Sequence, residues 1–441
     1  MDFSKRAYDH SFRLDPIVRS LLDTDFYKLL MGQFIFENYA STPVTFGLMN
    51  RTRRFKLADI IPEAELRAQL DHVRTLRFRP NELIWVAGAT FYGQERIFRP
   101  GFIEFLRSLS LPGYDLRNEE GQYVLTFSGS WAETTWWEIY ALAIVSELKS
   151  RAGHQQRTEL ELDFLYAGAK SKLLAKLRAL KELEGLALSE FGTRRRHSFL
   201  WQEWVVHAMA NVLGHRFVGT SNAFLAFKHG LDAKGTNGHE LPMVLAALAA
   251  DDAELKASQY DLLRRWQDAY SGNLLVALPD TFGTTQFLKD APEWLAANWR
   301  GYRPDSKPPF EAGEEIITWL QLRGIDQTTR FVLFSDGLDV AVPGHVAHGD
   351  DIASIHQRYA GRIGLAYGWG TNATNDFRGC DPRGEEVFDP LSLVCKVTAA
   401  NGRPAVKLSD NFNKASGPAA EVERYRRVFG VEGVSGAAVH V

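Results

Sequence analysis

Four segments of the chain repeat one pattern, in which a short apolar run ends in glycine or polar residues. The apolar runs lie at 217–218, 274–278, 331–334 and 363–367, and a helix-like stretch follows the first three. Repeated strand–helix units are typical of a parallel sheet, because each helix returns the chain to the edge where the next strand starts. The sequence therefore predicts an α/β fold whose parallel sheet is either open or closed into a barrel.

The residues before this repeat follow a different pattern and indicate a separate N-terminal α+β domain. The elements expected there and just after it are an amphipathic helix over 23–39, strands at 44–48 and 123–127, a long apolar helix from a capping box at Ser130 to Leu148, and a charged, solvent-facing helix over 158–182. Asn401-Gly402 predicts a hairpin. We therefore place one domain at 1–145, a second at 146–395, and a C-terminal hairpin and helix at 396–441.

Charge and cysteine content exclude several classes of protein. The 51 basic and 54 acidic residues among 441 leave a net charge of −3, which gives no bulk positive field for nucleic acid. Cys380 and Cys395 are too few for a disulfide framework and lack metal-site spacing. Residues 1–6 lead into polar residues rather than the apolar run of a targeting segment, and the apolar stretch near Leu142 is too short to span a bilayer. We expect a cytoplasmic protein that binds neither nucleic acid nor membrane.

Polar and glycine residues stand where the predicted strands end. These ends are Gly219-Thr220-Ser221, Asp280-Thr281, Asp336-Gly337 and Gly368-Trp369-Gly370-Thr371, and Arg303-Pro304-Asp305-Ser306 resembles a fifth. Because the active site of an α/β barrel lies at the carboxyl ends of its strands, we expect these distant segments to converge.

The chemistry of these segments indicates a phosphorylated ligand. Glycine followed by threonine or serine ahead of a helix offers N–H and hydroxyl groups to phosphate oxygens. Arginines add charge-assisted bonds, and carboxylates could hold Mg²⁺ or bind sugar hydroxyls. The candidates are Gly219-Thr220-Ser221, Gly235-Thr236, Gly370-Thr371, Arg194, Arg195, Arg196, Arg303, Asp280, Asp305 and Asp336. Each alone is more typical of a turn, a helix cap or a solvated surface, and only the whole set favours phosphate binding.

His239 differs from the other histidines in standing between Gly238 and Glu240, just before an Ala/Leu-rich helix. Such a histidine is accessible, and Glu240 or another carboxylate could orient its ring, so that it acts as nucleophile or general base. Spacing alone favours an ordinary loop histidine. We expect no metal cluster from His345, His348 and His356, because residues 344–351 have the composition of a loop.

Eight motifs occur in a fixed order along the chain. They are Asp23-Thr24-Asp25-Phe26-Tyr27-Lys28, Phe191-Gly192-Thr193-Arg194-Arg195-Arg196, Gly219-Thr220-Ser221, Gly235-Thr236-Asn237-Gly238-His239-Glu240, Arg303-Pro304-Asp305-Ser306, Phe334-Ser335-Asp336-Gly337-Leu338-Asp339, Gly368-Trp369-Gly370-Thr371-Asn372 and Lys407-Leu408-Ser409-Asp410. Together they closely resemble bacterial nicotinate phosphoribosyltransferases, a family of type II phosphoribosyltransferases. The resemblance runs from about residue 20 to 415, and it is the ordered set rather than any one motif that is specific.

The resemblance implies an irregular α/β barrel with an N-terminal α+β domain and a small C-terminal segment. It also implies a ligase-type enzyme of NAD biosynthesis and salvage. In that reaction nicotinate displaces diphosphate from 5-phosphoribosyl-1-diphosphate and gives nicotinate mononucleotide. ATP hydrolysis, with Mg²⁺, drives the step through a transient phosphohistidine. The family further implies a cytoplasmic homodimer with shared active sites.

The resemblance assigns roles residue by residue. His239 matches the phosphorylated histidine, Tyr27 a ring that stacks on the pyridine from the neighbouring subunit, Thr236 and Arg303 contacts to nicotinate, and Thr371 a contact to the phosphoribosyl group; Arg194, Asp336, Gly337 and Gly370 complete the pocket. Displacement at the sugar passes through an oxocarbenium-like state, so carboxylates are needed beside the ribose, and Asp305 and Asp336 could supply them. The resemblance assigns no metal ligands.

Two positions separate this chain from other patterns. Many family members continue the Arg-x-Asp-Ser motif with Gly-Asp, whereas Lys307-Pro308-Pro309 follows here, so Lys307 faces either a phosphate or solvent. Ser221 stands where relatives that prefer nicotinamide tend to have aspartate, and this favours nicotinate, because an aspartate would repel its carboxylate. The alternatives are a nicotinamide phosphoribosyltransferase, a non-catalytic nucleotide-binding barrel, and a sugar-phosphate barrel enzyme unrelated to pyridines.

Overall fold

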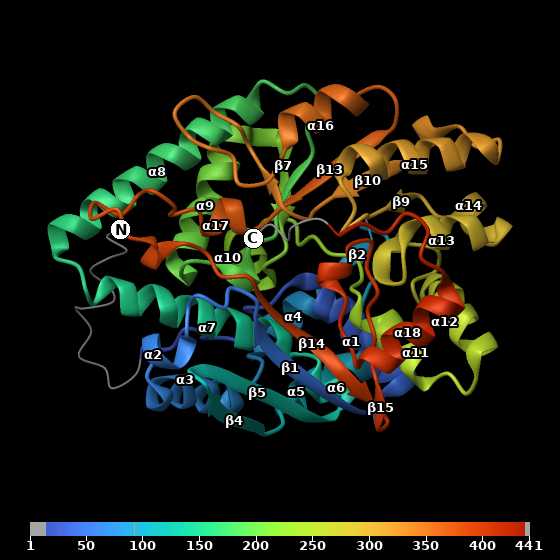
Figure 1. The fold of residues 1–441 in the computed structure, drawn as a ribbon, viewed down its shortest axis with the longest axis horizontal. Helices are drawn as coiled ribbons and strands as arrows, with labels where there is room; N and C mark the ends of the chain where they lie inside the picture. The colour runs from blue at the N-terminus through green and yellow to red at the C-terminus, as the bar shows by residue number, and fades with distance from the viewer. Residues whose placement is uncertain (1–14, 92, 437–441) are drawn as a thin grey trace.

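Two large β-sheets, one parallel and one antiparallel, lie next to each other and are covered by helices (Figure 1). The computed structural model describes residues 15–91 and 93–436. The start of the chain, interpreted above as lacking a targeting segment, lies outside these ranges. No helix among the described residues is both long enough and apolar enough to cross a membrane, and the cytoplasmic location stays a prediction.

The parallel sheet contains the strand–helix units predicted from the sequence, and the α/β fold class is confirmed. Its strand order is β7-β6-β13-β10-β9-β8, and every neighbouring pair is parallel. The strands are β6 (Leu188–Glu190), β7 (Phe217–Thr220), β8 (Val276–Ala277), β9 (Gly301–Tyr302), β10 (Phe331–Phe334) and β13 (Gly364–Trp369).

One extended segment joins the two edge strands of this sheet. Lys234 donates its backbone N–H to the carbonyl of Thr220 at the end of β7. Three residues later, the side-chain amide of Asn237 donates to the carbonyl of Val276 in β8. A few hydrogen bonds therefore replace the regular ladder that would close a symmetric barrel, which makes this barrel irregular.

Helices surround the barrel and connect its strands. They are α8 (Glu159–Lys181), α9 (Phe199–Leu213), α10 (Ala223–His229), α11 (Glu240–Leu248), α12 (Asp252–Ala269), α13 (Thr284–Asp290), α14 (Glu293–Asn298), α15 (Pro309–Leu322), α16 (Ile352–Tyr359) and α17 (Thr371–Thr374). In Figure 1 these helices lie around the strands of the parallel sheet.

The helix expected directly after Asp336-Gly337 is absent from that position. Gly337 has φ +61°, and the chain turns into the short strand β11 (Leu338–Asp339), which pairs with β12 (Asp350–Asp351) before α16 begins. The buried carboxylate of Asp339 accepts hydrogen bonds from Lys176 Nζ at 2.5 Å and from the backbone N–H of His348. These bonds satisfy the side chain without a helix.

The charged helix predicted over 158–182 forms as α8, but it is not merely a solvated face. Lys172 and Lys176 are buried and form ion pairs with Asp376, and Lys176 also pairs with Asp339. The sequence pattern could not reveal this, because the acidic partners lie more than 160 residues away along the chain.

The antiparallel sheet has the order β15-β14-β1-β5-β4. Its strands are β1 (Pro43–Asn50), β4 (Tyr114–Glu119), β5 (Gln122–Ser130), β14 (Leu393–Ala400) and β15 (Arg403–Pro404). The hairpin turn is confirmed, since Asn401 and Gly402 both have positive φ. The predicted boundary at 395 falls inside β14, which pairs with β1 in the middle of the N-terminal sheet.

Helices of the N-terminal region pack on this sheet, together with the small hairpin β2 (Thr90–Phe91) and β3 (Glu95–Arg96). They are α1 (Phe26–Tyr39), α2 (Leu57–Ile60), α3 (Glu63–Thr75), α4 (Pro80–Gly88), α5 (Pro100–Ser108), α6 (Trp131–Thr134) and α7 (Trp137–His154). Helix α1 is buried all round from residue 26 to 35, rather than on one face as predicted. The helix predicted from Ser130 is broken in two and ends at His154.

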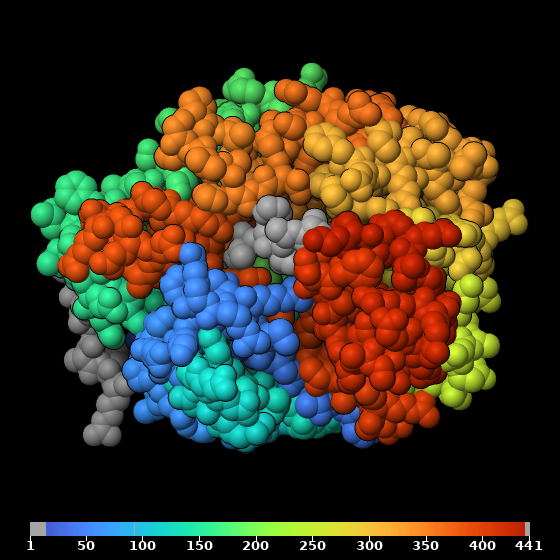
Figure 2. Space-filling model, viewed as in Figure 1, coloured from blue at the N-terminus to red at the C-terminus, as the bar shows by residue number. Residues whose placement is uncertain are grey.

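The C-terminal helix α18 (Ala419–Phe429) packs on the barrel side of the molecule. Phe282 stacks on Phe429 with ring centroids 4.3 Å apart, and Tyr425 contacts both rings. In the space-filling view, the C-terminal residues share one face with the N-terminal segments and with the late barrel segments (Figure 2). Sequence-distant parts of the chain therefore lie side by side around that face.

A buried ion pair joins the start of α1 to the barrel. Two guanidinium nitrogens of Arg196 each lie 2.7 Å from a carboxylate oxygen of Asp23, and both side chains are buried. The side-chain amide of Asn222 also donates to Asp23. The interpretation of residues 194–196 as a solvated surface run is therefore wrong for Arg196.

We expect Arg196→Ala to destabilise the protein by about 3–5 kcal/mol, because it leaves the Asp23 carboxylate buried without its counter-charge. The shift is measured as a lower urea midpoint of unfolding. Arg117→Ala is the matched control, since Arg117 forms an exposed ion pair with Asp115 and should cost about 0–1 kcal/mol. Equal shifts in the two variants would contradict the structural importance of the buried pair.

Candidate active site

A cavity of about 210 Å³ lies at the carboxyl end of the parallel sheet. One wall consists of residues that follow the barrel strands, such as Phe191 after β6 and Asp305 after β9. The opposite wall comes from the N-terminal region and the returning strand β14, including Tyr27 and Lys396. The predicted strand ends therefore do converge, and the N-terminal domain covers them.

His239 lies in this cavity with both ring nitrogens in contact. Nδ1 is 2.9 Å from the hydroxyl of Thr281, and Nε2 is 3.1 Å from a carboxylate oxygen of Asp305. The ammonium of Lys407 is 2.9 Å from the same Nε2. An ammonium can only donate and a carboxylate can only accept, so Nε2 either receives Lys407 with its lone pair or donates a proton to Asp305. It can therefore exchange a proton or act as a nucleophile.

Electrostatics favour the neutral imidazole. Burial lowers the pKa of His239, and the charge of Lys407 lowers it further, while Asp280 and Asp305 act in the opposite direction. Burial alone would raise the pKa of Asp305, but its hydrogen bond with His239 and the nearby cations hold that pKa well below its usual range. The site thus combines a neutral histidine with ionised carboxylates, an arrangement suited to nucleophilic chemistry.

Asp280 lies behind His239 and is fully buried. Its Oδ2 accepts hydrogen bonds from Ser306 Oγ at 2.7 Å and from Lys407 Nζ at 3.2 Å. Its Oδ1 has no hydrogen-bond partner among the described residues and lies 3.6 Å from Nε2 of His239. This free oxygen can accept a proton from the ring or contact a cation.

Glu240 does not orient the histidine, contrary to one sequence-based expectation. It points to the other side, where Lys28 and the indole N–H of Trp131 donate to its two oxygens. Lys28 is fully buried and also pairs with Glu138 at 2.6 Å. The ring of His239 is oriented by Thr281 and Asp305 instead.

Positive charge dominates the cavity wall. Among the described residues that line it, seven are basic and four are acidic: Arg51, Arg194, Arg195, Arg303, Lys396, Lys407 and Lys414 against Glu138, Glu240, Asp305 and Asp336. Burial and the adjacent charge of Arg194 lower the pKa of Arg195 to about 10. Burial and the charges of Lys407 and Arg51 also lower the pKa of Lys396. Arg194, Lys407 and Lys414 pair with carboxylates, but the wall keeps an excess of positive charge that a polyanionic ligand would balance.

Several of these basic residues were missed by the sequence reasoning. Arg51 and Lys396 lie at the end of β1 and in β14, where a basic residue is usually a solvated strand position. Lys414 pairs with the carboxylate of Asp336 across 78 positions of sequence. Only the Lys407 motif carried a signal, and its role was not assigned.

Tyr27, Phe46 and Phe191 give the cavity three aromatic rings among the described residues. Tyr27 is 7% exposed and lines the cavity of its own chain. The family resemblance instead implies that this tyrosine comes from the neighbouring subunit. A Cβ on Gly235 would lie 2.6 Å from the backbone nitrogen of Tyr27, so the loop before His239 approaches α1 closely and needs glycine there. The aromatic ring and the histidine loop are thereby placed together.

Arg303 and Thr236, which the resemblance assigns as contacts to nicotinate, also contact each other. Nη1 of Arg303 donates to the hydroxyl of Thr236 at 2.9 Å. Its Nε is buried and has no hydrogen-bond partner in the part of the chain that the structure describes, and the guanidinium lines the cavity. Thr236 itself is absent from the lining. Arg303 is therefore positioned to bind a carboxylate or phosphate group.

The remaining predicted residues fall into two groups. Arg194, Asp305, Asp336, Gly337, Gly370 and Thr371 all line the cavity. Ser221 does not, because it is fully buried and donates its hydroxyl to Asp25 at 2.7 Å. Burial raises the pKa of Asp25, whereas Arg194 and Ser221 counteract that rise. Ser221 is therefore linked to the cavity only indirectly, since Asp25 lies 3.7 Å from the guanidinium of Arg194, which lines it.

Glu190, at the end of β6, is another polar residue that the sequence reasoning missed. It accepts hydrogen bonds from the hydroxyl of Thr220 at 2.5 Å, from the amide of Gln202 at 3.0 Å and from the backbone of Gly192. Burial raises its pKa to about 7. A lone acidic residue in a short apolar strand was the available signal. Glu190 ties the ends of β6 and β7 together beneath the cavity.

One further expectation was wrong. Lys307 faces neither a phosphate nor solvent, because its side chain is 8% exposed and its ammonium contacts Glu315 and Thr285. His356, considered for a metal cluster, is buried and contacts the carbonyl of Glu184.

Two family models match the sequence of this chain. The nicotinate phosphoribosyltransferase (NAPRTase) N-terminal domain matches residues 22–146, and the nicotinate phosphoribosyltransferase (NAPRTase) family matches residues 186–433. These ranges contain both walls of the cavity.

Solved structures agree with this match. The chain is similar to a nicotinate phosphoribosyltransferase from Vibrio cholerae (31% identity, TM-score 0.80, 95% of this chain and 94% of that chain covered). It is also similar to one from Porphyromonas gingivalis (26%, 0.77, 94% and 100%) and to a putative one from Saccharomyces cerevisiae (26%, 0.80, 95% and 100%).

We expect Lys407→Met to raise the pKa of His239, because the variant removes a cation from Nε2 and leaves the Asp280 and Asp305 charges in place. The pKa is read from the pH dependence of hydrogen–deuterium exchange at the imidazole C2 position, followed by mass spectrometry of the His239 peptide. Lys407→Arg keeps the charge and serves as control. An unchanged or lower midpoint in Lys407→Met would refute the contact.

Proposed function

The chain belongs to the nicotinate phosphoribosyltransferase family, and from this premise we propose how its cavity works. The enzyme transfers the phosphoribosyl group of 5-phosphoribosyl-1-diphosphate to nicotinate in NAD biosynthesis. The observation that carries the assignment to this cavity is the meeting of a cationic wall, aromatic rings and the guanidinium of Arg303, which Thr236 holds in place, in one space.

The pyridine ring lies between Tyr27 and Phe191 in this proposal. Its carboxylate pairs with the guanidinium of Arg303, whose buried Nε lacks another partner. A planar aromatic slot and one cation suit a planar anion better than the neutral amide. This supports nicotinate over nicotinamide. The ring in the slot is in cis, and the expected homodimer with shared active sites rests on the family resemblance alone.

The phosphoribosyl donor places its phosphates against the basic wall. The nicotinate nitrogen forms a bond to C1 of the ribose, and the C1–oxygen bond breaks with its electron pair going to diphosphate. Lys396, Lys414 and Arg51 stabilise the negative charge that develops on the leaving group. Asp305 and Asp336 face the ribose and stabilise the positive charge that develops on the sugar.

ATP acts as a second substrate at His239. Nε2 attacks the γ-phosphorus, the nitrogen–phosphorus bond forms, and ADP leaves with the electron pair of the broken oxygen–phosphorus bond. Nδ1–H stays hydrogen-bonded to Thr281, which fixes the reactive tautomer. Lys407 neutralises the incoming phosphoryl oxygens. Water later cleaves the phosphohistidine and releases phosphate, so that hydrolysis is coupled to transfer.

Mg²⁺ fits the carboxylate oxygens at this end of the cavity. The free Oδ1 of Asp280 is a hard oxygen donor of the type that Mg²⁺ prefers, and Asp305 lies beside it. When bound, the ion supplies positive charge to the phosphate oxygens.

The overall assignment is tested by incubation with 5-phosphoribosyl-1-diphosphate, Mg²⁺ and either nicotinate or nicotinamide, with and without ATP. We expect nicotinate mononucleotide and diphosphate, a higher kcat/KM for nicotinate, and stimulation by ATP. A preference for nicotinamide would favour the amide-specific alternative, and no released diphosphate would favour a non-catalytic barrel.

Arg303→Met should raise the KM for nicotinate by about 10- to 100-fold, because a hydrogen bond to a charged group contributes about 1.5–3 kcal/mol. The KM for the phosphoribosyl donor should change less. Arg300→Met is the matched control, since Arg300 is exposed and lies outside the cavity lining. Equal effects on both substrates would remove Arg303 from the nicotinate contact.

His239→Asn should abolish ATP hydrolysis and ATP stimulation while slow, ATP-independent transfer continues, because only the phosphoryl acceptor is lost. Labelled phosphate from ATP should appear on the wild-type His239 peptide as an acid-labile group. His215→Asn, in the turn before β7, is the control. Full ATP stimulation of His239→Asn would end the proposal for this residue.

A further inference from the structure

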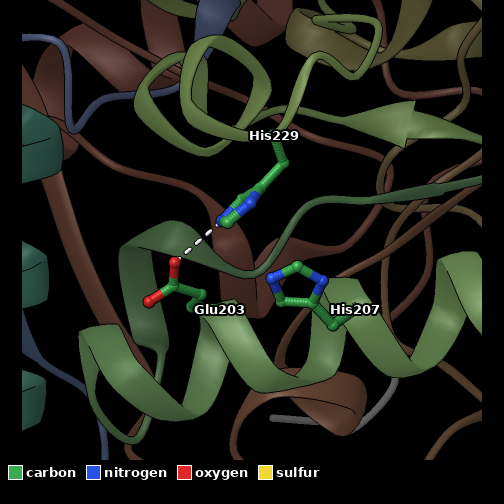
Figure 3. A group of neighbouring side chains, drawn as sticks. All are labelled: Glu203, His207 and His229. Carbon is green, nitrogen blue, oxygen red and sulfur yellow. Dashed lines mark hydrogen bonds and ion pairs between the residues drawn. The ribbon is translucent and has the colours of Figure 1, made fainter.

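Outside the active-site cavity, Glu203, His207 and His229 form a separate group of metal-ligand side chains (Figure 3). One donor atom from each residue lies within 4.8 Å of the others. None of the three lines the cavity. His207 is exposed, and the other two are partly buried, so the group lies at the surface.

The sequence places these side chains together for simple geometric reasons. Glu203 and His207 are four residues apart on α9, so they project from the same face of the helix. His229 is the last residue of α10, and Gly230 ends that helix in the left-handed conformation. Figure 3 shows Glu203 and His207 rising from one helix while the His229 ring points down toward them from the element opposite.

The present contacts leave metal-binding capacity unused. A ring nitrogen of His229 lies 2.7 Å from Glu203 Oε1, and Lys228 Nζ lies 2.5 Å from the same oxygen. No hydrogen bond is found for the ring nitrogens of His207 among the described residues. The two imidazole rings are T-shaped with centroids 4.2 Å apart. Two rings and one carboxylate that converge in this way resemble a ligand set more than a packing contact.

We propose that Glu203, His207 and His229 bind a zinc ion at the surface of the barrel, between α9 and α10. Two imidazole nitrogens and one carboxylate oxygen are ligands that Zn²⁺ accepts, and water takes the fourth tetrahedral position. Tetrahedral ligands about 2.0–2.1 Å from zinc lie about 3.3 Å from one another, so small side-chain rotations suffice. Mg²⁺ is disfavoured, since it prefers oxygen ligands.

Lys228 competes with the metal for Glu203. Its side chain is 44% exposed, so the ammonium can move into solvent when the ion binds. The lysine therefore weakens zinc binding without preventing it. This competition gives the proposal a variant that should improve binding as well as variants that abolish it.

The metal links two helices near the polar network beneath the active site. Asn222 is the N-cap residue of α10, and its side-chain oxygen accepts a hydrogen bond from the backbone N–H of Leu225, while its amide donates to Asp23 and Thr193. The ion pins the opposite end of α10 to α9. We expect the site to stabilise the fold rather than to take part in transfer.

The test uses the full chain in the His239→Asn background, because His239, Asp280 and Asp305 form a second candidate group for zinc. Zinc binding is measured by competition with a chromophoric chelator in millimolar Mg²⁺. The pH is 8, because ordinary imidazoles are neutral there and can bind metal. We expect one tightly bound zinc per chain. X-ray absorption should show nitrogen and oxygen neighbours at about 2.0–2.2 Å and no sulfur.

Three variants decide the proposal. His207→Ala should weaken zinc binding at least about tenfold. Even the loss of a residue that only hydrogen-bonds to a metal ligand lowers metal affinity by about that much. Lys228→Ala should tighten it. His215→Ala should leave it unchanged. Added zinc should raise the midpoint of thermal unfolding of the parent chain but not that of His207→Ala. In the presence of chelator the two proteins should unfold at the same midpoint, which would exclude misfolding of the variant.

Equal zinc affinity in the parent chain and in His207→Ala, or weaker binding in Lys228→Ala, would overturn the proposal. So would the absence of retained zinc. The enzyme with native His239 serves for a last comparison, in which His207→Ala should keep its transfer activity in the presence of a zinc-selective chelator and excess Mg²⁺. The zinc-binding outcomes are independent of the proposed function, since they depend on metal content and not on turnover.

Discussion

Two carboxylates ahead of α1 hold the N-terminal domain against the ends of the barrel strands. Asp23 receives two guanidinium nitrogens of Arg196, and Asp25 receives the hydroxyl of Ser221. Because both acids are buried, separating them from these partners would leave uncompensated charge in a medium of low polarity. The contact fixes the first turn of α1 and directs Tyr27 to the cavity. The position of the aromatic wall relative to the histidine loop depends on this junction.

Charges of both signs line the cavity, and their arrangement suits the proposed chemistry. The loops after the barrel strands supply the carboxylates of Asp305 and Asp336, whereas β14 and the segment that follows it supply Lys396, Lys407 and Lys414. In the proposed reaction, negative charge develops on diphosphate while positive charge develops on the sugar. Carboxylates beside the ribose and cations beside the diphosphate stabilise both ends of the breaking bond at once.

The strand ends and most of the site were predictable from the sequence, because their signals are local or belong to an ordered set of motifs. Gly370-Thr371, Asp305 and His239 each follow a recognisable strand or glycine loop and do line the cavity. Other features depend on partners that are remote in sequence. Lys176 appeared to be a surface residue until Asp339 and Asp376 were placed beside it, and Ser221 appeared to face a ligand although Asp25 receives its hydroxyl. Periodicity describes one element at a time and cannot reveal such pairings.

Strand β14 has a consequence for how the protein is made. It pairs with β1 in the middle of the antiparallel sheet, although some 340 residues separate the two strands. During synthesis the antiparallel sheet therefore stays incomplete, with one edge of β1 unpaired, until nearly the whole polypeptide has left the ribosome. Late pairing of this kind slows folding and exposes an aggregation-prone edge. Nascent chains that stop before residue 393 are expected to depend on chaperones.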